Sequence, residues 1–274
     1  MRSRCRLLIA IPDKSMQGRL MLEHLLRRDR QVVAIGTAAV AALAWAYLAS
    51  GAGMDTEMMA DMPDMAPMPW TPLYAALLFV MWWVMMIAMM APSAAPTVLL
   101  YATVKRKQET ESRAAIDAWI FLAGYLVAWA GFSLAAVLAQ GALERYGLLS
   151  MAMASTSAIL GGGILVAAGL YQFTPLKHSC LRYCESPLLF LSRHWRPGTL
   201  GAFRMGLRHG SYCIGCCWFL MVLLFVGGVM NLTWIIGIAL YVAAEKLLPF
   251  GRRLSHAAGA ILVLSGMIVL ARAM

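Results

Sequence analysis

Long apolar stretches separated by short charged segments dominate the chain. A helix that crosses a lipid bilayer needs about 20 predominantly apolar residues. The pattern predicts seven such spans, at 31–49, 72–104, 115–140, 153–173, 207–230, 232–248 and 256–272. We therefore expect an all-α fold, a polytopic transmembrane helix bundle of about seven spans.

Two features of these stretches concern helix packing. The second stretch is longer than a simple span, and Pro92 and Pro96 inside it are expected to kink it, dividing a membrane half from an emergent half. The third and fourth stretches contain small residues at Gly124, Gly131 and 161–163, which allow neighbouring helices to approach closely in lipid.

The composition supports a membrane protein. Hydrophobic residues make up 61% of the chain and charged residues only 13%, with a mean hydropathy of +0.71. Average soluble domains carry about 25% charged residues. So few charges cannot cover a water-facing surface, whereas a lipid bilayer requires no such cover. One membrane domain at 31–274 is the simplest division of the chain.

The distribution of Lys and Arg predicts the orientation, because short cytoplasmic segments are enriched in both. A basic arm at 1–30 has eight basic residues against three acidic ones, and a loop at 174–210 has six against Glu185. A loop at 50–71 has four acidic residues and no basic one. We expect the amino terminus inside, the loop at 50–71 outside and the carboxy terminus outside. The net charge of +10 then reflects topology and not a nucleic-acid partner.

Cysteines give the strongest chemical signal. Five of the six fall within 38 residues, at Cys180, Cys184, Cys213, Cys216 and Cys217. In the string HGSYCIGCCW, His209 precedes Cys213 by one helical turn, so that His209 and the last three cysteines share a helix face. Cys180 and Cys184 are also one turn apart. Thiolates are soft ligands that suit monovalent copper, with zinc as the alternative metal. Redox exchange and inert packing are the other interpretations of the cluster.

Methionine gives a second signal, with 21 residues in the chain. The predicted external loop interleaves six methionines with its acidic residues, which favours capture of monovalent copper over a linker of biased composition. In the second span, Met81, Met85 and Met89 repeat along one helix face. Their thioethers either pack the bundle or pass a soft cation stepwise.

Other polar residues in the predicted spans are few. Glu245 and Lys246, near the inner end of the sixth span, are expected to pair with one another or to snorkel. No role is predicted for His256. The chain contains no phosphate-binding loop, dinucleotide fingerprint or metalloprotease motif, so an enzyme is not the favoured interpretation.

Four strings carry a resemblance to a known family: MWWVMMIAMMAPSAAP at 81–96, LYQFTPLKHSCLRYCESP at 170–187, GLRHGSYCIGCCW at 206–218, and GVMNLTW with EKLLP within 228–249. They resemble the bacterial family of predicted metal-binding integral membrane proteins, some of which are labelled copper chaperones. The resemblance implies a multi-pass protein of the bacterial inner membrane. It also implies that the metal-binding motif consists of Cys180, Cys184, His209, Cys213, Cys216 and Cys217.

Together these patterns predict a membrane protein that binds, transports or delivers monovalent copper. A soluble copper-binding protein or an assembling copper enzyme is the expected partner. The alternative is a membrane thiol oxidoreductase that uses Cys213 and Cys216 as a Cys-x-x-Cys pair. A third interpretation is a purely structural subunit of a larger complex.

Overall fold

The computed structural model describes residues 33–50, 70–107, 111–149 and 155–273. Apart from one isolated bridge between Leu149 and Ser155, the regular structure in this part of the chain is helical, which confirms the all-α prediction. The helices are Val33–Ala49, α3 (Pro72–Arg106), α4 (Glu111–Arg145), α5 (Ala158–Tyr171), α6 (Pro175–Glu185), α7 (Pro187–His194), α8 (Thr199–Val222), α9 (Leu224–Gly227), α10 (Leu232–Leu247) and α11 (Gly251–Ala273). The basic arm and nearly all of the loop at 50–71 lie outside the described residues.

Four helical segments are long and apolar enough to cross a membrane. They are Pro72–Arg106, Arg113–Arg145, Thr199–Gly227 and Gly251–Ala273. A fifth span is formed if α5 and α6 are taken together, although the two helices meet at a bend of 66°. Several helices therefore have the length and composition of membrane spans, which supports the interpretation as a membrane protein.

The predicted count of seven spans is not confirmed. The helix Val33–Ala49 and the 16-residue helix α10 are both shorter than a typical span. The sequence predicts both apolar stretches as spans from hydropathy, which alone does not distinguish a short apolar helix packed inside a bundle from one that crosses lipid. By length and composition, the described residues thus contain four candidate spans, or five with the bent pair.

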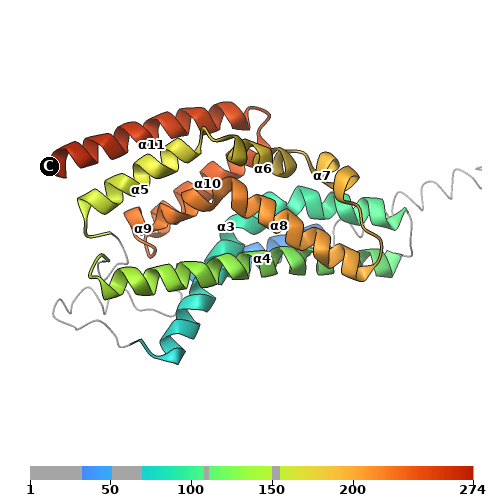
Figure 1. The fold of residues 1–274 in the computed structure, drawn as a ribbon. Helices are drawn as coiled ribbons and strands as arrows, with labels where there is room; N and C mark the ends of the chain where they lie inside the picture. Colours follow the sequence, from blue (N-terminus) through green and yellow to red (C-terminus); the bar gives the residue numbers. More distant parts are fainter. Residues whose placement is uncertain (1–32, 51–69, 108–110, 150–154, 274) are drawn as a thin grey trace, which may run out of the picture.

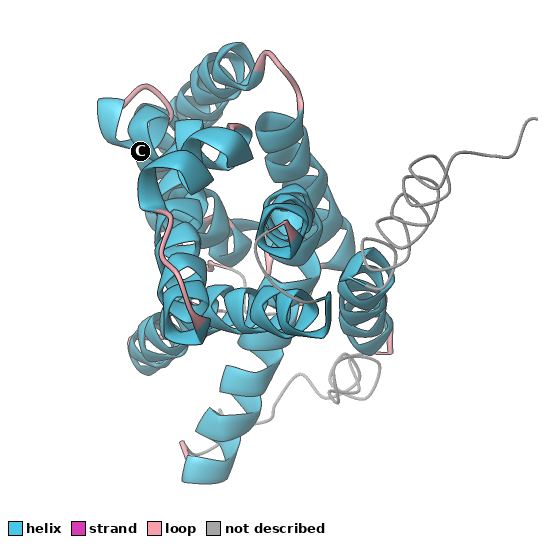
Figure 2. Ribbon diagram, turned by 90° about the vertical axis from the view of Figure 1, so that its right-hand side faces the viewer, coloured by secondary structure: helices cyan, strands magenta, loops and turns pink. Residues whose placement is uncertain are grey.

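The helices form a bundle in which α8 has a central position (Figure 1). It packs along α4 on one side and against α6 on the other, while α3 packs along α4. A second close pair, α5 and α11, lies beside this group, with α10 between the two (Figure 1). Figure 2 views the same bundle from the end, with several helices seen along their axes. The central position of α8 matters for function, since this helix carries three of the five clustered cysteines.

The segment predicted as a loop at 174–210 is largely helical in the structure. Thr174 caps α6 by accepting a hydrogen bond from the backbone N–H of Lys177, and Pro175 occupies the first turn, where its missing N–H costs nothing. Ser186 caps α7 in the same way. Three of the six basic residues of this segment lie on the short helices α6 and α7, two lie on the first turns of α8, and Arg196 lies between α7 and α8. Hydropathy averages miss α6 and α7 because the apolar faces of short amphipathic helices are narrow.

Helix α3 continues through both internal prolines, Pro92 and Pro96. Proline lacks the N–H that would bond to the carbonyl four residues earlier, so Pro92 leaves the carbonyl of Ala88 without its helical partner. The indole N–H of Trp45 donates to that carbonyl at 3.1 Å. The freed carbonyl thereby binds the helix Val33–Ala49 to α3.

Candidate metal centre

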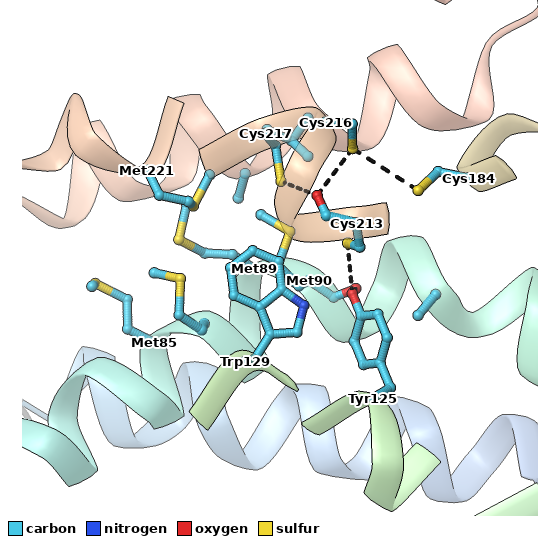
Figure 3. Close-up of a cluster of buried hydrophobic side chains, with 14 of the residues drawn as sticks. Met85, Met89, Met90, Tyr125, Trp129, Cys184, Cys213, Cys216, Cys217 and Met221 are labelled. Atoms are coloured by element: carbon cyan, nitrogen blue, oxygen red, sulfur yellow. Dashed lines mark hydrogen bonds between the residues drawn. The ribbon is translucent and has the colours of Figure 1, made fainter. Parts of the chain in front are cut away.

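Helices α6 and α8 bring the clustered cysteines together. The sulfur atoms of Cys184 on α6 and Cys216 on α8 lie 3.9 Å apart (Figure 3). Cys180, one turn before Cys184, packs its sulfur against Gly215 of α8, where an added Cβ would lie 2.7 Å from the sulfur. Cys184, Cys213, Cys216 and Cys217 are buried, and Cys180 is partly exposed. All five thiols are free.

The backbone of α8 fixes two of these thiols. Both Cys216 and Cys217 donate to the carbonyl oxygen of Cys213, at 3.0 and 2.9 Å (Figure 3). The same carbonyl also accepts the helical N–H bond, so the three donors share its two lone pairs. The sulfurs of Cys216 and Cys217 are therefore held beside Cys213 on the buried face of the helix, as the spacing predicted.

Cys213 has two further polar neighbours from other helices. The hydroxyl of Tyr125 on α4 lies 3.0 Å from its sulfur, and the amine of Lys246 on α10 donates to it at 3.0 Å. Lys246 also lies 3.6 Å from the Met90 sulfur and 3.9 Å from the Cys217 sulfur. The sequence predicts Glu245 as the partner of Lys246. It gives no signal for the contacts of Lys246 with Cys213 and Met90, which lie on other helices.

Glu245 and Lys246 do not pair with one another, in contrast to the expectation from the sequence. Neighbouring residues of a helix point about 100° apart, and the two side chains reach different helices. The Glu245 carboxylate binds Lys177 of α6 at 2.7 Å and accepts a hydrogen bond from the Tyr241 hydroxyl at 3.2 Å. Glu245 and Lys177 are both fully buried, so this ion pair joins α10 to α6 next to the cysteine cluster.

His209 lies on the same buried face of α8 as the cysteines. Its ring packs among the aromatic rings of Phe121, Tyr125 and Phe190, with centroid distances of 6.1, 5.7 and 4.8 Å. Its buried Nδ1 atom has no hydrogen-bond partner in the described part of the chain. The location in an aromatic pocket fits a packed histidine as well as a ligand, and the assignment of His209 as a ligand stays a prediction.

The methionines of α3 are internal. Met81, Met85 and Met89 are each at most 2% exposed, and Met86 and Met90 are fully buried. Figure 3 shows Met85, Met89 and Met90 together with Met221 of α8 on the side of the cysteine cluster that faces away from Cys184. Sulfur-bearing side chains therefore continue from the cysteines into the methionine stripe, a continuity that the separate motifs in the sequence did not reveal.

A histidine pair lies on the far side of α6. The Nε2 atoms of His178 on α6 and His256 on α11 are 3.1 Å apart, and Phe173 stacks on the His256 ring. No signal in the sequence joined these two residues, which are 78 positions apart. The pair shows that α6 is fixed on both sides, with its histidine toward α11 and its cysteines toward α8.

The donor atoms do not form a closed coordination shell. Among the described residues, no three side chains of the His, Cys, Asp and Glu types lie close enough together to hold a metal ion as they stand. The separation of the Cys184 and Cys216 sulfurs, 3.9 Å, nevertheless matches two ligands of one ion. With metal–sulfur bonds of about 2.3 Å, two sulfurs at a trigonal angle lie about 4 Å apart.

Comparison with known proteins adds the family. A family model described as a copper chaperone, PpoB2, matches residues 79–269. The chain belongs to this family. The match begins in α3, just before the methionine stripe, and ends in α11, so it includes the stripe, the cysteine cluster and Lys246. Membership of the copper chaperone family confirms the resemblance that the sequence strings suggested. No curated protein and no solved structure matches the chain.

Proposed function

We propose that this protein is a membrane copper chaperone that holds monovalent copper at the buried cysteines of α6 and α8 and exchanges it along the methionines of α3. Copper is the cargo in this proposal and not a permanent part of the fold. The observation that carries it is the buried sulfur cluster itself, in which thiols of two helices and a thioether of a third converge. Soft sulfur ligands favour monovalent copper, and membership of the copper chaperone family points to the same metal.

The geometry supports sulfur coordination with few ligands. Cys184 and Cys216 have the separation of two ligands of one ion, and Cys213 and Cys217 lie on the adjoining surface of α8. Monovalent copper accepts two or three sulfur ligands, whereas a structural zinc site needs four. An open cluster of this kind suits an ion that is bound and then passed on.

The oxidoreductase alternative receives no support from these positions. Thiol exchange requires a thiolate that a partner can reach. Cys213 is 2% exposed and Cys216 is fully buried, and the Cys216 thiol donates to the carbonyl of Cys213 and not to its sulfur. We therefore favour metal binding by the same residues.

The proposal predicts that the cysteines of α8 retain the metal. Wild-type protein purified without oxygen and offered both copper and zinc should retain copper, measured by elemental analysis and by titration against a competing chelator. Changing Cys213, Cys216 and Cys217 together to Ser should abolish this retention, because a hydroxyl is a poor ligand for a soft ion. A triple variant that keeps the wild-type copper content would exclude the assigned site.

Two single variants refine the test. Cys5→Ser serves as the control, since Cys5 is far in the sequence from the five clustered cysteines and its change is expected to leave copper retention unaltered. His209→Ala, measured at pH 7.5, decides whether the histidine is a ligand. A loss of copper affinity of about tenfold, which corresponds to roughly 1.4 kcal/mol, supports coordination by His209. Unchanged affinity would leave His209 in the aromatic pocket as a packing residue.

The methionine stripe is predicted to act in movement of copper and not in its tight retention. Changing Met81, Met85 and Met89 to Leu removes the thioethers and conserves apolar volume, at a cost usually below ~1.5 kcal/mol. We expect a folded protein that still retains copper but delivers it more slowly in cells, as measured by the rate at which a copper enzyme gains activity. An undiminished rate in a folded triple variant would show that these methionines only pack the core.

A further inference from the structure

Lys246 occupies the position from which the sulfur ligands of the proposed site would bind a cation. Its amine nitrogen lies 3.0 Å from the Cys213 sulfur, 3.6 Å from the Met90 sulfur and 3.9 Å from the Cys217 sulfur. The sulfurs belong to α8 and α3, whereas Lys246 comes from α10. A cationic group from a third helix is therefore already present among the donors.

The contacts of Lys246 differ from those of an ordinary buried lysine. A buried ammonium group is normally paired with a carboxylate, because an isolated charge in an apolar interior is costly. Lys246 is 3% exposed, but the nearest carboxylate in sequence, Glu245, is bound to Lys177. The remaining hydrogen-bond contact of Lys246 within the described residues is the Ser93 hydroxyl at 3.5 Å. Sulfur atoms and one hydroxyl therefore hold its amine.

We infer that Lys246 is an intramolecular competitor for the metal ion, which withdraws when copper binds and returns when copper leaves. The inference rests on the proposed function. The N–H groups of the ammonium point at the sulfur lone pairs that a metal ion would use. Two positive charges also repel one another strongly where little water screens them. The ammonium and the metal ion therefore cannot share Cys213 and Met90.

This competition lowers the affinity of the site for metal ions. The ammonium weakens the binding of every metal ion by a similar factor, so that an ion must have a high affinity for sulfur, as monovalent copper has, to displace it. The returning ammonium also supplies a replacement partner for the sulfurs when the ion departs. Lys246 thus sets the affinity of the site and favours release of the ion.

The test compares copper affinity in full-length Lys246 variants in detergent, by anaerobic titration of monovalent copper against a competing chelator. Lys246→Leu and Lys246→Gln remove the charge without adding a sulfur ligand, whereas Lys246→Arg keeps it. Both neutral variants should bind copper at least about tenfold more tightly, because a hydrogen bond from a charged donor no longer opposes binding. Lys246→Arg should gain nothing, and Lys107→Met, an exposed lysine at the end of α3, should match wild type.

A neutral variant with a damaged structure would bind copper more weakly than wild type. Tighter copper binding therefore indicates that the competing ammonium has been removed. Unchanged or weaker binding in both neutral variants overturns the inference, and copper binding by wild type would then leave the proposed function intact. If copper binds only to the variants in which Lys246 is neutral, the competition is supported. The proposed function is then wrong, because the wild-type protein does not bind copper. If no variant binds copper, both the inference and the proposed function are wrong.

Discussion

Gly124→Ala is expected to destabilise the protein by at least about 2 kcal/mol, because α4 and α8 touch through their backbones at this residue. A Cβ at Gly124 would overlap the carbonyl oxygen of Phe203 and would lie 2.9 Å from the backbone nitrogen of Leu207. The contact is reciprocal, since a Cβ at Gly206 on α8 would overlap the carbonyl oxygen of Phe121 on α4. Backbone atoms cannot rotate away as a flexible side chain can, so the two helices would have to separate.

The chain offers a matched control on the same helix. Gly131 lies seven residues after Gly124, and a Cβ there would meet nothing within 4 Å. Gly131→Ala should therefore be neutral or stabilising by up to about 1 kcal/mol, since alanine is the better helix former. Thermal unfolding of the two variants in detergent measures the difference. Equal melting temperatures would show that α4 and α8 do not meet as closely as the structure describes.

This pair of glycines illustrates how far the sequence predicts the packing. Small residues in the apolar stretches predicted close helix approach, and the structure confirms it at Gly124 and Gly162, where added Cβ atoms would press on α8 and α11. The sequence could not distinguish them from Gly131 and Gly163, which face open space. The difference depends on where two helices cross, and local sequence contains no information on the crossing point.

In the candidate metal site, too, the sequence predicts some of the contacts and not others. Helical spacing placed Cys213, Cys216 and Cys217 on one face of α8, and the structure buries all three. Spacing also placed Cys180 and Cys184 on neighbouring turns, and both now contact α8. These successes concern residues that are close in sequence, where the geometry of one helix determines their relation.

Contacts between distant helices were beyond sequence reasoning. The approach of Lys246 to Cys213 and of His178 to His256 depends on how α10 and α11 pack against the rest of the bundle. The count of seven spans is not confirmed for a related reason, because the apolar composition of α10 does not show whether this 16-residue helix crosses lipid. Whether a short helix crosses the membrane depends on its length and neighbours, and hydropathy records neither.

The other large effect is expected at the buried ion pair between Lys177 of α6 and Glu245 of α10, whose charged atoms lie 2.7 Å apart. Lys177→Met should destabilise the protein by about 3–5 kcal/mol, because it leaves the Glu245 carboxylate buried without a counter-charge. Replacing both residues, as in Lys177→Met with Glu245→Gln, should restore most of the lost stability. The two groups are fully buried, so removing both charges also removes the cost of keeping them away from water.

A double-mutant cycle measured by thermal unfolding in detergent tests this expectation, with Lys107→Met as the control for loss of an exposed lysine. If Lys177→Met alone melts at the wild-type temperature, the pair does not stabilise the fold. The double variant Lys177→Met with Glu245→Gln then distinguishes a role of the ion pair in the fold from a role at the metal site. It should still retain copper, because the ion pair holds α6 and α10 together while Cys184 and Cys216 supply the sulfur ligands. A folded double variant that has lost copper would instead show that these charges act on the metal site itself.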